Sequence, residues 1–357
     1  MREFLPWRDL LTYLDAILRV YNRYGRRDNI HKARIKILLK DHGIDRFTAE
    51  VEEEWSHLRG GPATLIEDEV RRIEGRFTRP PYASGAGAPE ASVAAQVQAP
   101  ADGSSDPAYD RWRARNVHGH KVPGYAAVTL SLKRAGQPPG DVTSDEMDAI
   151  AALADRYSFG ELRVSHEQNV ILPDVPAAAL AGLWHEVRAL GLATPNVGLL
   201  TNIICCPGGD FCSLANAKSI PIAEAIRARF EDLDYLFDIG ELDLNISGCM
   251  NACGHHHIGH IGVLGVDKNG EEWYQVEIGG AQGERASLGR VLGRAFAAAE
   301  VPDVVERLIQ HYLAVRDSDA ERFIDTVRRA GTEGFKQAVY DDTHQKPADR
   351  RRQLAAA

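Results

Sequence analysis

The sequence reads CPGGDFC at residues 206–212 and CMNAC at residues 249–253, so two short segments each carry a pair of cysteines. An iron–sulfur cubane needs one thiolate for each iron, and two loops with two thiolates each can hold it from opposite sides. Glycines flank both pairs and allow tight turns that bring backbone N–H groups close to sulfur. These glycines are Gly208, Gly209, Gly248 and Gly254. The two segments therefore predict a [4Fe–4S] site with the ligands Cys206, Cys212, Cys249 and Cys253.

The fifth cysteine, Cys205, directly precedes Cys206. Neighbouring side chains on an extended backbone point in opposite directions, so only one of the two can face the cluster. The spacing to Cys212 favours Cys206 and leaves Cys205 as a packed thiol. A helix expected over residues 213–230 would direct the positive end of its dipole toward the cluster. A structural zinc site and inert buried cysteines are the alternatives, although zinc sites more often show CxxC spacing.

The composition limits the classes of function. The chain has 357 residues, 44% of them hydrophobic and 26% charged, which is enough to build the cores of two domains. A net charge of −9 disfavours binding to nucleic acid or to an anionic membrane. No apolar run reaches the roughly 18 residues of a membrane span, and charges interrupt the N-terminus where a signal peptide would be apolar. We therefore expect a cytoplasmic protein with reduced cysteines.

Residue spacing and composition divide the chain into five parts. Apolar residues recur at helical spacing near the N-terminus, for example at Leu10, Leu14 and Leu18. A stretch rich in Pro, Gly, Ala and Ser follows, which cannot support a core and indicates a flexible linker. Beyond it, strand-like and helical stretches mix, which predicts an α+β fold. The parts are a helical region at 1–77, the linker at 78–117, mixed regions at 118–195 and 196–342, and a frayed tail at 343–357.

Several elements are expected within the mixed regions. The expected strands cover residues 126–132, 242–247, 261–267 and 273–278, with a hairpin over 161–175. The expected helices cover residues 144–157, 176–190 and 213–230, and helices return over 301–340.

Longer stretches around these motifs resemble the sirohaem- and [4Fe–4S]-dependent nitrite and sulfite reductase family, including its sulfite reductase hemoproteins. The cysteines lie in CCPGGDFCSLANAKSIPIA (205–223) and NISGCMNACGHHHIGHIGVLGV (245–266). Two stretches, HKVPGYAAVTLSLK (120–133) and LRVSHEQNVILPDV (162–175), resemble the family's second ferredoxin-like repeat. A third, RVYNRYGRRDNIHKARIKILLKDHGIDRF (19–47), resembles the closing helices of the family's first haem-binding half. The resemblance implies a ferredoxin-like half-repeat and a sirohaem/[4Fe–4S]-binding α/β domain, preceded by a helical remnant of the first haem domain.

The resemblance implies an oxidoreductase that reduces sulfite to sulfide with six electrons, at a sirohaem coupled to the cluster. Reduction of nitrite to ammonia is the alternative reaction. A truncated, non-catalytic iron–sulfur module and a zinc-stabilised interaction domain are the alternatives of other classes. The implied partners are sulfite or nitrite and an external electron donor, either ferredoxin or an NADPH-dependent flavoprotein. The family's first half carries most of the basic residues that hold the substrate anion, so a separate chain that supplies this half is a further expected partner.

The resemblance also implies roles for single residues. Cys253 would bridge the cluster to the haem iron, and Asn251 would approach the sirohaem. Arg163 and Gln168 would contact the haem from the expected hairpin, with a structural salt bridge as the alternative for Arg163. Arg163 and Lys218 are the candidates for contact with the substrate anion, with a solvent-facing side chain as the alternative for Lys218. No catalytic residue is assigned.

Four of the thirteen histidines lie within six residues, at His255, His256, His257 and His260. Imidazoles near haem carboxylates or on a proton path fit the resemblance. Ordinary packing and an independent metal site are the alternatives.

Overall fold

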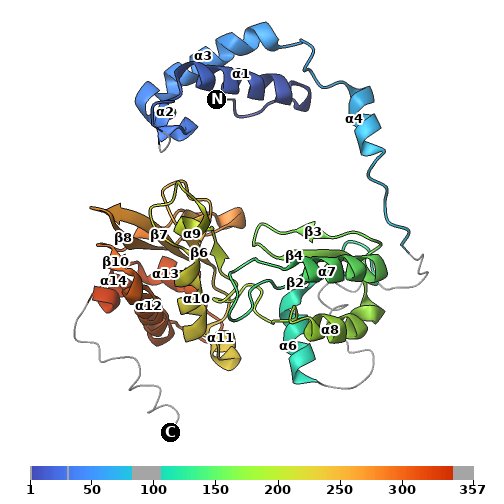
Figure 1. Cartoon of the computed structure of the whole chain (residues 1–357), viewed down its shortest axis with the longest axis vertical. Helices are drawn as coiled ribbons and strands as arrows, with labels where there is room; N and C mark the ends of the chain where they lie inside the picture. The colour runs from blue at the N-terminus through green and yellow to red at the C-terminus, as the bar shows by residue number, and fades with distance from the viewer. Residues whose placement is uncertain (1, 30–31, 83–105, 341–357) are drawn as a thin grey trace. The chain divides into compact units, whose positions relative to one another are not determined.

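A computed structural model describes residues 2–29, 32–82 and 106–340 of the chain (Figure 1). It divides into two units, Met1–Tyr82 and Ala83–Ala357, whose boundary falls inside the predicted linker. The predicted frayed tail lies outside the described residues. No helix among the described residues is long and apolar enough to span a membrane.

The first unit is helical, as its apolar spacing predicts. The helices α1 and α3 pack together around Tyr13, Val20, Phe47 and Trp55, all of which are buried. Gly43 has φ +85 and separates α2 from α3, because this backbone conformation ends a helix and favours glycine. The elements are η1 (Trp7–Asp9), α1 (Leu10–Tyr24), α2 (Ile35–His42), α3 (Ile44–Leu58) and α4 (Glu67–Glu74).

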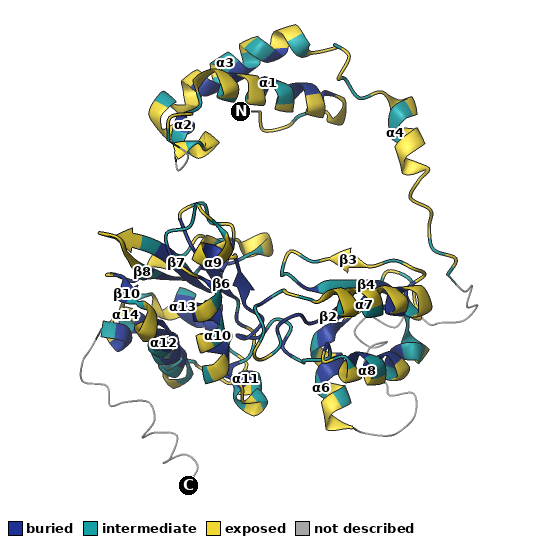
Figure 2. Cartoon of the chain, viewed as in Figure 1, coloured by how far each residue is buried: buried dark blue, intermediate teal, exposed yellow. Residues whose placement is uncertain are grey.

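The leucines of α1 do not form the core of this unit. The helix buries Tyr13, Ala16 and Val20 against α3, because these residues share its other face. The leucine face is solvent-exposed within the unit (Figure 2), with Leu10, Leu11 and Leu14 each 45% exposed and Leu18 56% exposed. The first unit therefore presents a row of apolar side chains on its surface.

The second unit begins with a four-stranded antiparallel sheet in the order β1-β2-β4-β3. Its core contains Trp112, Val128, Leu153, Leu172 and Leu183. The pairing of β3 with β4 confirms the predicted hairpin, and β3 lies exposed at the sheet edge while β4 is mostly buried (Figure 2). The elements are α6 (Pro107–Asn116), β1 (Val117–Gly119), β2 (Tyr125–Leu130), α7 (Ser144–Tyr157), β3 (Arg163–Val164), β4 (Val170–Pro176), η3 (Ala177–Ala179) and α8 (Leu180–Ala189).

The linker predicted over residues 78–117 extends too far, because its last eleven or so residues are ordered as α6 and the start of β1. The Asp106 carboxylate caps α6 by accepting the N–H of Ala108 at 2.9 Å, and Pro107 occupies the first turn. The indole of Trp112 is fully buried in the core, which ties the helix down. The Asp-Pro pair was the sequence signal for this helix.

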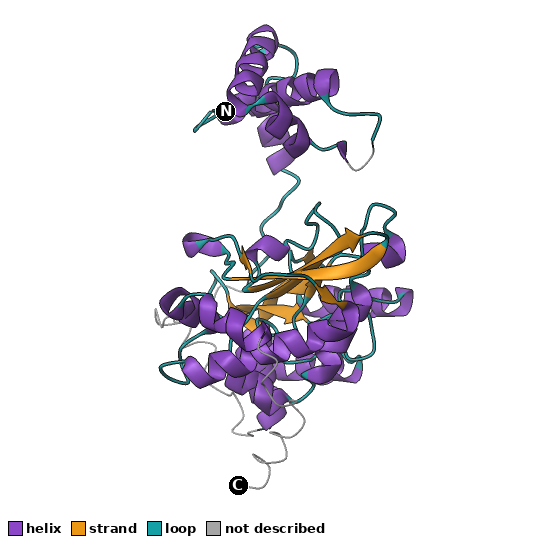
Figure 3. Ribbon diagram, turned by 90° about the vertical axis from the view of Figure 1, so that its left-hand side faces the viewer, coloured by secondary structure: helices purple, strands orange, loops and turns teal. Residues whose placement is uncertain are grey.

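The remainder of the second unit is built on a six-stranded sheet with the path β10-β8-β7-β6-β5, to which β9 adds beside β8. Helices α10, α12 and α13 pack against one face of this sheet (Figures 1 and 3) and share a core with it. The elements are β5 (Ile204–Cys205), α9 (Gly208–Phe211), α10 (Ile220–Arg229), α11 (Leu233–Ile239), β6 (Leu244–Ser247), η4 (His256–Ile258), β7 (Ile261–Lys268), β8 (Glu271–Ile278), η5 (Gly283–Arg285), β9 (Arg290–Val291), β10 (Phe296–Ala297), η6 (Ala298–Glu300), α12 (Val301–Val315), α13 (Phe323–Ala330) and α14 (Glu333–Tyr340).

The helix predicted over residues 213–230 is wrong in its first part, because α10 begins only at Ile220. The N–H groups of Asn216 and Ala217 instead donate to the carbonyl of Gly248, at 2.8 and 3.0 Å. Pro221 lies in the first turn of α10, where its missing N–H costs nothing. No helix dipole therefore begins directly after Cys212.

Candidate metal and cofactor site

Parallel strands bring the two cysteine loops together. Strands β5 and β6 are neighbours, with Ile204 opposite Asn245 and Cys205 opposite Ile246. Each strand is followed by one cysteine pair, and the carboxyl ends of parallel strands lie at the same edge of a sheet. The N–H of Cys206 continues the ladder by donating to the carbonyl of Ile246 at 3.1 Å. Both cysteine loops therefore begin at this edge.

Glycines let the two loops touch. A Cβ atom on Gly248 would lie 2.6 Å from the carbonyl oxygen of Ala217 and 2.8 Å from the Cα of Gly208. Gly208 has φ +56, and a Cβ there would lie 2.5 Å from the backbone nitrogen of Ser219. Contacts this short exclude any side chain at these positions. The backbone of the first loop thus lies directly against that of the second.

The Cys206 sulfur receives polar contacts from the second loop and from Ser219. The N–H of Gly248 donates to Sγ at 3.1 Å, and the Ser219 hydroxyl lies 3.5 Å from it. Such donors stabilise a thiolate, as the flanking glycines predicted. Cys206 and Cys249 are buried, Cys212 is half-buried and Cys253 is exposed. The most exposed of the four cysteines is therefore the one predicted to bridge to the haem.

The cysteine sulfurs do not gather as they would around a single metal ion. Four thiolates around one zinc, each at 2.3 Å from the metal, would lie about 3.8 Å apart. Among the described residues, which include every cysteine, no three sulfurs lie within 4.8 Å of one another. A cubane distributes its thiolates over separate irons. The described cysteines therefore do not form a ready-made site for one zinc ion, and the [4Fe–4S] cluster with its four cysteine ligands stays a prediction.

The thiol of Cys205 is packed in the core of the second unit. It lies 3.2 Å from the carbonyl oxygen of Cys206 and can donate to it. Burial raises the pKa of the Cys205 thiol, with a smaller contribution from Cys206, so the group stays protonated. A protonated, buried thiol is a poor metal ligand, which agrees with its predicted packing role.

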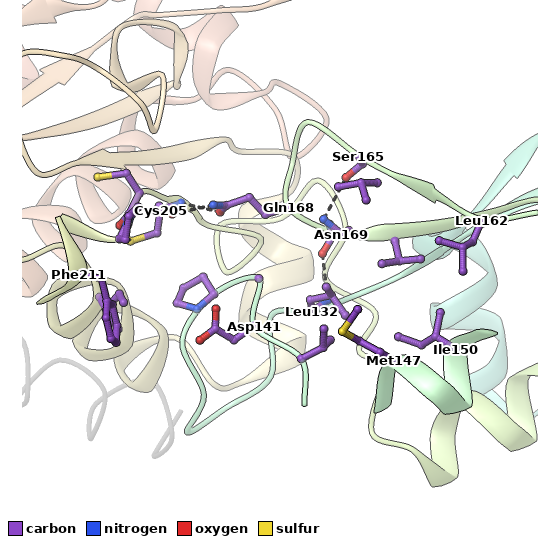
Figure 4. Close-up of a pocket in the computed structure, with 18 residues that line it drawn as sticks. Leu132, Asp141, Met147, Ile150, Leu162, Ser165, Gln168, Asn169, Cys205 and Phe211 are labelled. Carbon is purple, nitrogen blue, oxygen red and sulfur yellow. Dashed lines mark hydrogen bonds between the residues drawn. The ribbon is translucent and has the colours of Figure 1, made fainter. Parts of the chain in front are cut away.

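Gln168 connects the ferredoxin-like repeat to the first cysteine loop (Figure 4). Its Nε2 donates to the carbonyl of Cys205 at 2.7 Å, and its Oε1 accepts the N–H of Cys205 at 2.9 Å. Gln168 lies in the β3–β4 turn with φ +58. The side chain thereby positions the residue that precedes Cys206. Its predicted contact with the haem stays a prediction.

We expect Gln168→Ala to lower the free energy of unfolding by about 3 kcal/mol, because it removes two hydrogen bonds with the backbone of Cys205 and one from Nζ of Lys133, at about 1 kcal/mol each. Urea unfolding measures this. The matched control is Arg163→Ala on the same hairpin, which removes an exposed ion pair worth well under about 1 kcal/mol. Equal effects of the two substitutions would contradict the positioning role of Gln168.

The other predicted contact residues are spread over the site. The guanidinium of Arg163 is exposed on β3 and pairs with Glu161 at 2.6 Å, which is the salt bridge given as its alternative. The exposed Nζ of Lys218 lies 3.9 Å from a carboxylate oxygen of Asp210, inside the first cysteine loop. Asn251 is half-buried in the second loop. Haem or substrate contacts of these residues stay predictions.

The four histidines have separate environments. His255 is exposed with φ +53 at the start of η4, and His256 is fully buried. His257 pairs with Glu277, with 3.2 Å between Nδ1 and Oε2. His260 accepts the N–H of Asp243 at its Nδ1, at 3.1 Å, and burial lowers its pKa to about 4. His260 is therefore neutral at neutral pH.

A cavity of about 670 Å³ lies beside the first cysteine loop (Figure 4). Cys206 and Phe211 line it from the loop, and Met147, Val164 and Gln168 line it from the ferredoxin-like repeat. Phe211, Val164 and Met147 are 80%, 79% and 60% exposed, so the cavity continues into an apolar surface. Such a surface is typical of a binding site or an interface.

Lys133 is a buried cation that the sequence did not reveal. Its side chain is 2% exposed, and Nζ donates to Oε1 of Gln168 at 3.3 Å. Burial lowers its pKa to about 7. Lysines are rarely buried, so a lysine at the end of a strand-like stretch gives no signal of such a site.

We expect Lys133 to add stability to the cofactor-free chain as the pH rises from about 7 toward 10. The unfolded lysine, with its pKa near 10.5, binds a proton that the folded one has lost, so raising the pH favours folding. The total gain has an upper limit of about 4 kcal/mol. Lys133→Met should remove this part of the pH profile in denaturant unfolding. If the free energy of unfolding changes with pH equally in the wild type and in Lys133→Met over this range, the role of Lys133 is contradicted.

Two family models cover most of the described chain. The model of the nitrite and sulphite reductase 4Fe-4S domain matches residues 1–58 and 198–347, and both cysteine loops lie in the second range. The chain belongs to this family. The model of the nitrite/sulfite reductase ferredoxin-like half domain matches residues 120–190, which contain the four-stranded sheet from β2 onward. This membership implies a [4Fe–4S] cluster and sirohaem as the cofactors.

Relatives named for both substrates match the chain. A chloroplastic ferredoxin–nitrite reductase of Betula pendula is 28% identical over 321 residues, covering 86% of this chain and 46% of that protein. A ferredoxin sulfite reductase of Mycobacterium tuberculosis is 29% identical over 341 residues, covering 92% and 52%. The solved structure of the Mycobacterium tuberculosis NirA protein matches with a TM-score of 0.59 and 26% identity, covering 93% of this chain and 54% of that one. The chain thus spans about half the length of these relatives.

Proposed function

We propose that this chain forms the cluster- and sirohaem-binding half of an enzyme that reduces sulfite to sulfide. The observation that carries the proposal is the meeting of the two cysteine loops at the carboxyl ends of β5 and β6. When bound, the cluster and the sirohaem would supply the electrons and the iron at which a small oxyanion is reduced.

The residues of this chain would hold and tune the cofactors. Cys206, Cys212 and Cys249 are the proposed ligands of three irons, and the exposed Cys253 is the proposed bridge to the haem iron. The N–H of Gly248 would lower the negative charge on the Cys206 sulfur. Lys218, exposed beside the first loop, would attract the substrate anion, because reducing an anion needs positive charge nearby.

Nitrite is the alternative substrate, since relatives named for nitrite and for sulfite match at similar identity. Ferredoxin is the proposed electron donor because it appears in the names of both groups of relatives. Rates with sulfite and with nitrite, measured with the same chemically reduced donor, distinguish the two substrates.

We further propose that the family's first half completes the enzyme, either in the same polypeptide or as a separate chain. Two apolar surfaces support this. The leucine face of α1 is exposed in the first unit, and Phe211 and Val164 are exposed in the second. A first half would cover such surfaces and would supply most of the basic residues that hold the substrate anion in this family.

The test is a visible spectrum with iron and sulfide analysis of anaerobically purified protein that was co-expressed with sirohaem synthesis. Sirohaem bands with about four cluster irons and one haem iron support the proposal. Cluster absorption without sirohaem would instead support the non-catalytic iron–sulfur module. A colourless protein that contains zinc would overturn both.

A further inference from the structure

A second group of metal-binding side chains lies outside the cysteine loops. His256 and His257 on η4 and Glu277 on β8 each place a donor atom within 4.8 Å of the other two. Among the described residues this is the one such group of three. His256 is fully buried and Glu277 is 5% exposed, while the side chain of His257 is 47% exposed. The group therefore has a buried base and an open side.

The distances suit ligands of one ion. The ring centroids of His256 and His257 are 3.8 Å apart, so the two imidazoles lie against each other. Nδ1 of His257 lies 3.2 Å from Oε2 of Glu277. Ligands that are 2.0–2.2 Å from one metal ion lie about 3 to 3.5 Å apart. The distance between Nδ1 of His257 and Oε2 of Glu277 already lies in this range.

Glycines hold this group in place. Gly262 on β7 lies opposite Glu277 in the strand register, and a Cβ atom there would lie 2.2 Å from the carbonyl oxygen of His256. A Cβ on Gly289 would lie 3.1 Å from the Cβ of Glu277, and the N–H of Gly289 donates to the carbonyl of His257 at 2.7 Å. Because a side chain is excluded at Gly262, η4 can lie directly against β7.

The donor set favours a divalent transition metal. Two imidazoles with one carboxylate bind Zn²⁺ in hydrolytic enzymes and Fe²⁺ in oxygenases. A buried carboxylate needs a positive partner, and a divalent ion supplies one at a pH where imidazole is neutral. The simpler explanation is an ion pair of His257 with Glu277. That ion pair does not involve His256, so a substitution of His256 can distinguish the ion pair from a metal site.

We propose that His256, His257 and Glu277 bind one divalent transition-metal ion of the zinc type, separate from the four cysteine ligands. Three protein ligands leave a coordination position for water on the exposed side, next to His257. The ion would join η4, which begins three residues after Cys253, to β8. It would thereby fix the end of the second cysteine loop. The proposal does not depend on the reductase activity.

The test is a Co²⁺ titration of the full chain with its cluster intact, followed by calorimetry and by difference absorption. The occupied cysteines cannot then take the metal, and unchanged cluster absorption verifies this. We expect one equivalent to bind with the weak visible bands of nitrogen and oxygen ligation, without sulfur-to-cobalt charge transfer. Zn²⁺ should displace it, because zinc accepts the same ligands.

Variants separate this site from surface histidines. Glu277→Gln keeps the shape of the side chain and should weaken Co²⁺ binding by about 100-fold or more, since even the loss of an outer-shell partner costs 10- to 100-fold. His256→Gln should weaken it similarly, and thermal unfolding checks that each variant folds. The matched control is His255→Ala, which removes the exposed neighbour and should bind Co²⁺ normally.

Three results would overturn the proposal. They are no Co²⁺ binding by the wild-type chain, equal binding by the wild type and Glu277→Gln, or normal binding by a folded His256→Gln variant. The last would leave the ion pair as the role of His257 and Glu277.

Discussion

Cys206→Ser is expected to remove the cluster, while Cys205→Ser in the adjacent position leaves it in place. The Cys206 sulfur lies where the second loop reaches it and receives the N–H of Gly248 at 3.1 Å. Serine offers a hard oxygen in place of the soft thiolate that iron–sulfur clusters require. We expect bound iron and sulfide to fall about tenfold, with loss of the visible absorption.

The neighbouring cysteine is an unusually close control. Cys205 is buried in the core, and its raised pKa keeps it a thiol. A serine there can still donate to the carbonyl of Cys206, at a cost of about 1 kcal/mol for burying the hydroxyl. Iron content therefore separates the two variants even though both are slightly destabilised. Loss of iron in Cys205→Ser with retention in Cys206→Ser would reverse the ligand assignment.

The sequence predicted the cysteine site because its signals are local. Ligand type and spacing lie within seven residues in one loop and five in the other. The pairing that joins the loops was not predicted, because β5 has only two residues, Ile204 and Cys205, and two residues show no alternation. Its partner β6 was predicted within two residues of its observed start. The pairing of distant strands thus determines how the two loops meet, and the spacing of the cysteines could not predict that pairing.

The errors in the helices have a similar origin. Residues 213–219 contain ordinary helix formers, yet Asn216 and Ala217 give their N–H groups to Gly248 in the other loop. A tertiary contact overrides helix propensity there. The histidine run shows the same limit, since Glu277 lies twenty residues beyond His257 and meets it only through strand pairing. Contacts between distant segments decide these positions.

The contact between the loops leads to the second large effect. We expect Gly248→Ala to separate the loops, because its Cβ would lie 2.6 Å from one backbone atom and 2.8 Å from another. Backbone atoms cannot move aside as a side chain can, so overpacking here should cost about 3 kcal/mol or more. The cluster should be lost with it, because a ligand pair shifts with each loop. Iron content and urea unfolding measure the two effects.

Gly182→Ala is the matched control for adding one methyl group. Gly182 lies within α8, where the added Cβ would meet only the Tyr157 hydroxyl at an ordinary 3.5 Å. Alanine in a helix is favoured over glycine by about 1 kcal/mol, so this variant should gain stability and keep its cluster. A Gly248→Ala chain with normal iron content would mean that the two loops do not need direct backbone contact. Opposite signs for the two substitutions would instead establish that this contact, and not glycine content, holds the cysteines together.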